Sequence, residues 1–155
     1  MIGITIIKSA ADSATACRAV QKQLEQAAMR AGEATREAVM DIAVDCLQRS
    51  VERAPAEGGL RASGYASVNG DVVAWGREDG SVTVAASAAA DAGDVNIATV
   101  GFTASGAFGQ HEHTEADYAP GGQAKFLESV VMENEGRWAK QLNESARRGF
   151  KKGGA

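Results

Sequence analysis

The sequence predicts an α+β domain with a long N-terminal helix, an antiparallel sheet of four or five strands, and a C-terminal helix packed on the sheet. Three observations predict this class. Helix-forming residues without proline run from about 12 to 53, short apolar alternations lie between turn signals from 65 to 113, and helical periodicity returns after 123. The 155 residues suit one domain over 1–155, with a basic flexible tail over about 149–155.

The first predicted helix spans about 12–53 and carries an apolar stripe whose members are mostly three, four or seven residues apart. Gly32 is its only glycine, so one helix or two with a break there are both open. Ala54-Pro55 ends it, because the residue before proline is pushed out of the α region. The other side of the helix is predicted to be a solvated face with ion pairs three or four residues apart. The stripe comprises Val20, Leu24, Ala27, Ala31, Ala38, Ile42 and Leu47, and the solvated face comprises Asp41, Asp45, Arg49, Glu52 and Arg53.

The predicted strands alternate apolar and polar residues and are bounded by turn signals. Asn69-Gly70-Asp71 between 65–68 and 72–75 is a hairpin signal. Asp79-Gly80 marks the next turn, and the small polar residues of 85–94 indicate a loop. The remaining predicted strands are a short one over Ile2, Ile4 and Ile6, then 82–84, 96–103 and 108–113.

The second predicted helix begins near Gln123 and ends near Phe150. Its apolar face is expected to dock on the sheet. Trp75 and Trp138 are interpreted as core or interface anchors, since no basic residues interleave with them as a nucleic-acid groove requires. The apolar face comprises Phe126, Leu127, Val130, Val131, Trp138, Leu142 and Ala146.

Composition narrows the function classes. The chain is 45% hydrophobic but only 5% aromatic, which predicts a thin core of small side chains that depends on neighbours. The net charge of −4 argues against a nucleic-acid surface over the whole domain. The basic run over 147–152 is the local exception, either as cations at a helix end or as a contact with nucleic acid. No signal peptide or membrane span is expected.

The two cysteines, Cys17 and Cys46, both fall in the first helix. In one straight helix they would lie about 43 Å apart, too far for a disulfide. A reducing, intracellular place of assembly is therefore expected.

The stretch "GQHEHTEADYAPGGQAKFLE" holds both histidines of the chain. On a strand, His111 and His113 point to the same face and could share a zinc ion with Asp117 or Glu115. The pattern lacks the HExxH spacing of helical zinc sites, so polar residues at a strand end or subunit contact are the alternative. No GxSxG elbow, Walker loop or Rossmann loop occurs, so neither an enzyme nor a cofactor is expected.

Two stretches together resemble a known family. "ERAPAEGGLRASGYAS" is similar to the A-P-x-x-[ST]-G-x-L-R-x-S segment of small bacteriophage neck proteins, the tail-component and tail-completion family also described as minor capsid proteins. "FGQHEHTEADYAPGGQAKFLESVV" resembles the family's second mark, which runs from His-Glu through a loop to a Gly-Gln-Ala-Lys-Phe-Leu-Glu helix start. The first stretch is one residue short and lacks Ser or Thr before Gly, and Gly106-Ala107-Phe108-Gly109 replaces an aromatic-Ala-x-aromatic pattern. The matching residues are Pro55, Gly58 or Gly59, Leu60, Arg61 and Ser63, then His111, Glu112, Gly122, Gln123, Ala124, Lys125, Phe126, Leu127 and Glu128.

The resemblance covers about 34–148 and implies a structural virion protein at the head–tail junction. It implies a homo-oligomeric ring, with a hexamer favoured over a dodecamer, assembled in the host cytoplasm. Neighbouring neck and tail-tube proteins and passing DNA would be its other partners. A minor capsid or head-closure protein is the alternative within this class. Outside it, the alternatives are a metal-dependent enzyme using His111 and His113, or a nucleic-acid-binding module using the basic tail.

On this resemblance, Lys125, Phe126 and Leu127 begin a helix whose apolar face docks on the sheet. Arg61 and Glu112 are expected to make polar pairs within the sheet or between subunits rather than to act in catalysis.

Overall fold

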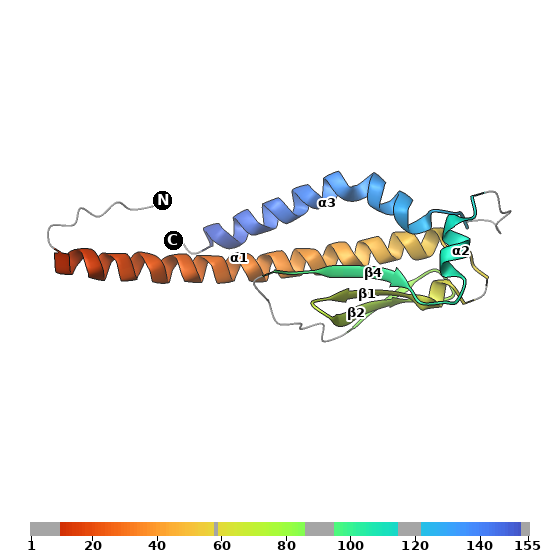
Figure 1. Cartoon of the computed structure of the whole chain (residues 1–155), viewed down its shortest axis with the longest axis horizontal. Helices are drawn as coiled ribbons and strands as arrows, with labels where there is room; N and C mark the ends of the chain where they lie inside the picture. Colours follow the sequence, from red (N-terminus) through yellow and green to blue (C-terminus); the bar gives the residue numbers. More distant parts are fainter. Residues whose placement is uncertain (1–9, 58, 86–94, 115–121, 153–155) are drawn as a thin grey trace.

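The computed structural model describes residues 10–57, 59–85, 95–114 and 122–152 (Figure 1). The strand predicted over 2–6, most of the loop over 85–94, Glu115 and Asp117 lie outside these residues. The α+β fold is confirmed. Its elements, in chain order, are α1 (Ala10–Arg53), the 3-10 turn η1 (Arg61–Ser63), β1 (Gly64–Val68), β2 (Asp71–Gly76), β3 (Val82–Val84), β4 (Ala98–Phe102), α2 (Ala107–Glu112) and α3 (Phe126–Lys151).

Helix α1 is a single helix of 44 residues, about 66 Å long, and Gly32 does not interrupt it. It runs the length of the molecule, with α3 along one side and the sheet along the other (Figure 1). Its N-terminal part extends beyond both. As predicted, the helix ends before Pro55, and Cys17 and Cys46 are both free thiols.

The sheet has the order β3-β2-β1-β4, and all of its pairs are antiparallel. Asn69 and Gly70 connect β1 to β2 with φ of 51° and 90°. Both residues therefore adopt the left-handed conformation that a two-residue hairpin turn requires, which is why Asn-Gly predicted the turn correctly. The register shifts between Ala66 and Ser67 of β1, because β2 has an extra residue, Val73, between their partners Ala74 and Val72.

The core between α1 and the sheet is built mainly from small side chains, as the composition predicted. Val39, Ala43, Leu47 and Val51 recur every fourth residue, which places them on one face of α1. They pack against Ala66 and Val68, which alternate on β1, and against the consecutive residues Val73 and Ala74 of β2.

Helix α3 runs antiparallel to α1 and packs mainly along it. At its start, Phe126 reaches the sheet through an edge-on ring contact with Phe102 of β4, with centroids 5.0 Å apart. At its other end, Gly149 is buried, and a Cβ atom there would lie 2.6 Å from the Arg30 carbonyl oxygen and 2.8 Å from the Ala31 Cα. The missing side chain lets the two helices approach closely. The first part of the tail predicted over 149–155 is therefore helical.

Polar contacts also join α1 to α3, and they modify the predicted solvated face. The Asp45–Arg49 ion pair forms as predicted, at 3.0 Å. However, Asp45 also accepts hydrogen bonds from Arg137 at 2.5 Å and from the Trp138 indole at 3.0 Å. Burial on its own would raise the pKa of the Asp45 carboxyl, but the hydrogen bonds from Arg137, Trp138 and Arg49 together lower it below its usual value. Trp138 is a buried anchor, as predicted, whereas Trp75 is exposed.

The prediction of a last strand over 108–113 is wrong, because Ala107–Glu112 forms the short helix α2. Gly106, with φ of 86°, turns the chain into this helix. Ala107 packs against the cluster that contains Phe126, and the His111 ring contacts Phe126 directly. Ala107 and His111 are four residues apart, a spacing that brings both side chains to one side of a helix. Among the described residues, no helix is long and apolar enough to cross a membrane.

Candidate functional site

The two family-like stretches, 52–67 and 108–131, meet in space at the end of α1, although residues 68–107 separate them in sequence. Ala54 and Leu60 from the first stretch and Phe126 from the second are all buried in one cluster. Phe102 of β4 and Leu127 pack against it. We call this cluster, together with His111, the motif junction.

The first stretch ends α1 and turns the chain into the sheet. The Arg61 guanidinium donates to the carbonyls of Ala54 (2.9 Å) and Glu52 (3.4 Å). The last carbonyls of a helix have no partner within the helix, and a cation there is favoured by the helix dipole. Ser63 closes the turn, because its hydroxyl donates to the Leu60 carbonyl at 2.7 Å. The predicted polar role of Arg61 is therefore met within the chain, at the end of α1 rather than in the sheet.

The second stretch begins α3 and reaches back to α1. The Gln123 N–H donates to the Arg53 carbonyl at 2.9 Å, which satisfies another of the last carbonyls of α1. Lys125 precedes α3 with φ of 53°, and its N–H donates to the His111 carbonyl at 2.7 Å. Phe126, the first residue of α3, is only 1% exposed. The predicted helix start and the burial of Phe126 are confirmed.

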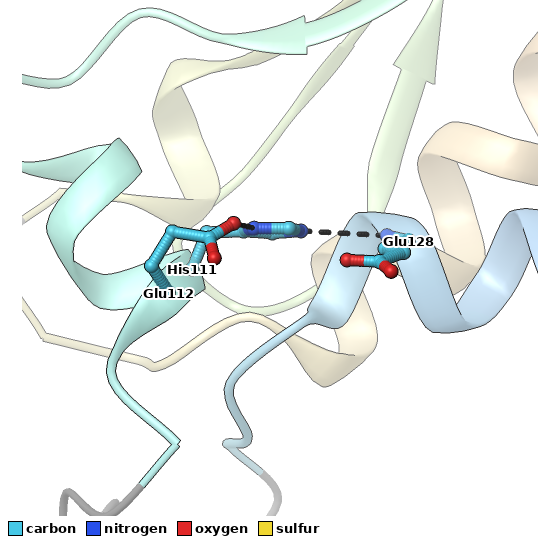
Figure 2. Close-up of side chains that lie close together, drawn as sticks. All are labelled: His111, Glu112 and Glu128. Atoms are coloured by element: carbon cyan, nitrogen blue, oxygen red, sulfur yellow. Dashed lines mark hydrogen bonds and ion pairs between the residues drawn. The ribbon is translucent and has the colours of Figure 1, made fainter.

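His111 contacts three neighbours, and Figure 2 shows two of these contacts, with Glu112 and Glu128. Its ring lies edge-on to Phe126 with centroids 5.0 Å apart, Nδ1 is 2.8 Å from Glu112 Oε1, and Nε2 is 3.4 Å from the Glu128 backbone nitrogen. A backbone N–H can only donate, so we assign Nε2 of His111 as the acceptor of the Glu128 N–H. Nδ1 then carries the ring proton and donates a hydrogen bond to Glu112. In this tautomer both ring nitrogens already have hydrogen-bond partners.

The Lys125 ammonium lies between two carboxylates. Its Nζ is 2.5 Å from Glu112 Oε2 and 3.0 Å from Glu128 Oε2. Hydrogen bonds from Lys125 and then His111 lower the pKa of Glu112, and hydrogen bonds to Glu112 and then Glu128 raise the pKa of Lys125. All three groups are exposed enough for water to screen them, so these ion pairs contribute little to the stability of the fold.

A metal site can be tested against this geometry. Ligand atoms of His111, Glu112 and Glu128 lie within 4.8 Å of one another, which is compatible with a cation. However, Lys125 already supplies the positive charge between the carboxylates, and the Nε2 lone pair accepts from the helix start. His113 is exposed and does not belong to this group, so the predicted sharing of a zinc ion by His111 and His113 finds no support in the described residues. The donor set fits an ion-pair cluster better than a metal.

The sequence does not predict two contacts at this end of the molecule. The first is the ion pair of Glu128 with Lys125: Glu128 enters the sequence analysis only as part of the family pattern, although its position as the third residue of α3 favours an acid. Arg53 was placed on a solvated face, but its guanidinium donates to Ser129 and Glu133 of α3 at 3.0 Å each. No local signal predicts that pair, because it depends on how α1 and α3 pack.

Two hollows lie at the opposite end of the α1–α3 contact. One has a volume of about 340 Å³ and apolar walls, and it is lined by Ala31, Ala146, Arg147, Phe150 and Lys151. The second has a volume of about 410 Å³ and includes Arg30, Glu37 and Arg148 in its lining. Neither contains a residue of the motif junction.

Comparisons with known proteins add no assignment. The chain matches no protein-family profile, no curated protein and no solved structure at a significant level.

Proposed function

We propose that this chain is a structural, non-enzymatic subunit of a tailed-bacteriophage virion. It forms a homo-oligomeric ring at the head–tail junction, joins the tail to the head and lets DNA pass. The ring is a hexamer, with a dodecamer as the other closed form. The observation that carries the proposal is the convergence of the two family-like stretches on one buried cluster.

This convergence supports the resemblance because chance matches have no reason to meet. Arg61 of the first stretch and Gln123 of the second both donate hydrogen bonds to carbonyls at the end of α1. Leu60 of the first stretch and Phe126 of the second are buried in the same cluster. The two short patterns therefore supply the residues that connect α1, the sheet and α3, as expected of a sequence pattern that specifies a fold.

The exposed apolar side chains also favour an assembling protein. Large apolar residues are exposed in several separate places, among them Leu24 on the N-terminal part of α1, Trp75 on the sheet and Phe108 on α2. A ring needs two different surfaces on each subunit, because every interface joins unlike patches until the circle closes. Exposed apolar groups in several places meet that requirement better than a single binding patch would.

The His111 cluster fits a structural role. Its hydrogen bonds and ion pairs account for the arrangement of His111, Glu112 and Lys125 without a substrate. The net charge of −4 also suits a conduit, because an acidic or neutral lumen would not retain passing DNA. An electropositive lumen in the assembled ring would contradict this part of the proposal.

The decisive experiment images phage particles assembled without this protein and measures the mass of the native oligomer. Tailless heads beside free, complete tails would support the joining role, and normal virions would refute it. Heads that fail to retain DNA would favour the alternative of a head-closure ring, and defects in the shell would favour a minor capsid protein.

The basic end of α3 is a candidate for contact with passing DNA. Arg147, Arg148, Lys151 and Lys152 are all exposed in its last turns. Because Gly149 packs tightly on α1, charge-removing substitutions test this better than deletion of the tail. Replacing Arg147 and Lys151 with Gln should weaken duplex binding and reduce its salt dependence. Binding that does not change would leave DNA contact without support at this end.

A further inference from the structure

The N-terminal part of α1 extends past both the sheet and α3 (Figure 1). We call residues 15–30 the arm. Nearly all of its described side chains are exposed, including Val20 at 54% and Leu24 at 55%. An isolated helix of this length is marginally stable in water, so an apolar arm favours a partner helix.

The apolar side chains of the arm follow the spacing of a coiled coil. They recur at alternating intervals of three and four residues, which draws one seam along the helix. The seam continues into the part of α1 that α3 covers, where Ala31 and Ala34 lie against Gly149. The arm is therefore an open extension of a helix-packing surface that the chain already uses. The seam consists of Cys17, Val20, Leu24, Ala27, Ala31, Ala34 and Ala38.

The charges beside the seam permit contact with an identical arm. The positions that flank it between 17 and 28 are Gln21, Gln23 and Ala28, so like charges do not face each other across a pair of arms. The charged side chains of the arm are Arg18, Lys22, Glu25 and Arg30. The first three lie further round the helix, and Arg30 lies at the end of the arm that is next to α3.

The basic end of α3 decides the direction of pairing. Parallel arms would bring the clusters at 147–152 of two copies side by side, and like charges at such close range repel. Antiparallel arms would hold the two clusters apart by the arm's length, about 24 Å, which exceeds the Debye length of about 8 Å at physiological salt. An antiparallel partner arm would also continue in line with α3, beside the apolar hollow at Ala31 and Phe150.

We propose that the arm binds the arm of a second copy of this chain, antiparallel and through the exposed part of the seam from Cys17 to Leu24, since Ala27 is already buried within the chain. This inference goes beyond the proposed function, because a ring closes through unlike surfaces whereas two antiparallel arms form a two-fold contact. Each arm contributes only three exposed seam side chains, Cys17, Val20 and Leu24, so we expect a contact smaller than the standard of about 800 Å² per partner and a dimer that depends on concentration.

The test measures the mass of the full chain by analytical ultracentrifugation from low micromolar to near-millimolar concentration. Leu24→Glu places a charge in the seam and should abolish the concentration-dependent doubling of mass. Met29→Glu is the matched control, because Met29 is 69% exposed and lies about 140° round the helix from Leu24. It should pair like the wild type. Equal pairing by both variants, or a wild type that never doubles, would overturn the proposal.

A fold control accompanies these measurements. Both side chains are exposed in a single chain, so both variants should keep the wild-type melting temperature at the lowest concentration. Val20→Glu provides a second seam variant should Leu24→Glu alone lower the melting temperature.

Cys17 reports on the seam directly, because it is exposed whereas Cys46 is buried. Its rate of modification by a thiol reagent should fall as protein concentration rises. Fast modification at every concentration would overturn the proposal. Slow modification at every concentration would also overturn it, since the chain's own residues would then cover the seam.

The direction has its own readout. In a Lys152→Cys variant that also carries Cys17→Ser, a short thiol cross-linker should not join antiparallel copies. Efficient cross-linking would overturn the antiparallel arrangement. None of these measurements depends on the virion role, so pairing can fail while that role stands, and the reverse.

Discussion

Phe126 is the side chain whose removal most directly tests the motif junction. It is 1% exposed, it packs with Leu60 of the first stretch, and its ring meets the edges of Phe102 and His111 at 5.0 Å each. Truncation of a buried Phe to Ala costs about 3 to 5 kcal/mol. Two aromatic contacts of about 0.5 to 1.5 kcal/mol each belong to that total, so Phe126→Ala should lie near about 4 kcal/mol.

For a chain of this size, each kcal/mol lowers the melting temperature by about 2 to 4 °C, so the expected decrease is roughly 8 to 16 °C. Thermal unfolding followed by circular dichroism measures it. Phe108→Ala is the control, because Phe108 belongs to the same stretch but is 81% exposed. That variant should stay within about 0.5 kcal/mol of the wild type. An unchanged melting temperature for Phe126→Ala, or equal losses for both variants, would refute the placement of this side chain.

Three further predictions address other parts of the structure. Gly76→Ala should lower the free energy of unfolding, measured by chemical denaturation, by about 3 kcal/mol, because the added Cβ would lie 2.1 Å from the Arg61 carbonyl oxygen. Gly109→Ala is the control, because a Cβ at Gly109 would have no atom within 4 Å. The lowered pKa of Asp45 means that its charged form stabilises the fold above the unfolded value of about 3.9 and that this stability is lost as pH falls through the folded pKa. Asp45→Asn should therefore lower the melting temperature at pH 7 and flatten its decline below about pH 4; an unchanged acid limb would show that the carboxylate contributes nothing. Excess zinc should leave the melting temperatures of wild type and His111→Ala unchanged, whereas a rise in the wild type alone would indicate a metal site.

Much of this fold could be predicted because its signals are local. The helix-forming composition of α1 extends over 44 residues, and Pro55 marks its end without reference to the rest of the chain. Asn69-Gly70 specifies a turn through its own backbone preference. In each case the residues that carry the signal are also the residues that adopt the structure.

Helix α2 and the motif junction could not be predicted in the same way. Six residues are too few for helical periodicity to differ from strand alternation, and α2 is held through contacts of Ala107 and His111 with the cluster around Phe126. The sequence predicts the histidines on a strand, where they could share a metal ion. In the structure His111 instead accepts a hydrogen bond from the Glu128 N–H at the start of α3. This contact cannot be predicted without the position of α3.

The junction also separates folding from assembly. Leu60 and Phe126 are buried, and Arg61 binds carbonyls of its own chain, so these residues have little left to offer a neighbouring subunit. Resemblance at these positions therefore supports a shared fold more directly than a shared partner. Contacts between subunits must come from exposed side chains such as Trp75 and Phe108, whose removal leaves the monomer's core intact. If the chain forms the proposed ring, loss of Phe126 should weaken folding and assembly together, whereas loss of an exposed interface residue should weaken assembly alone.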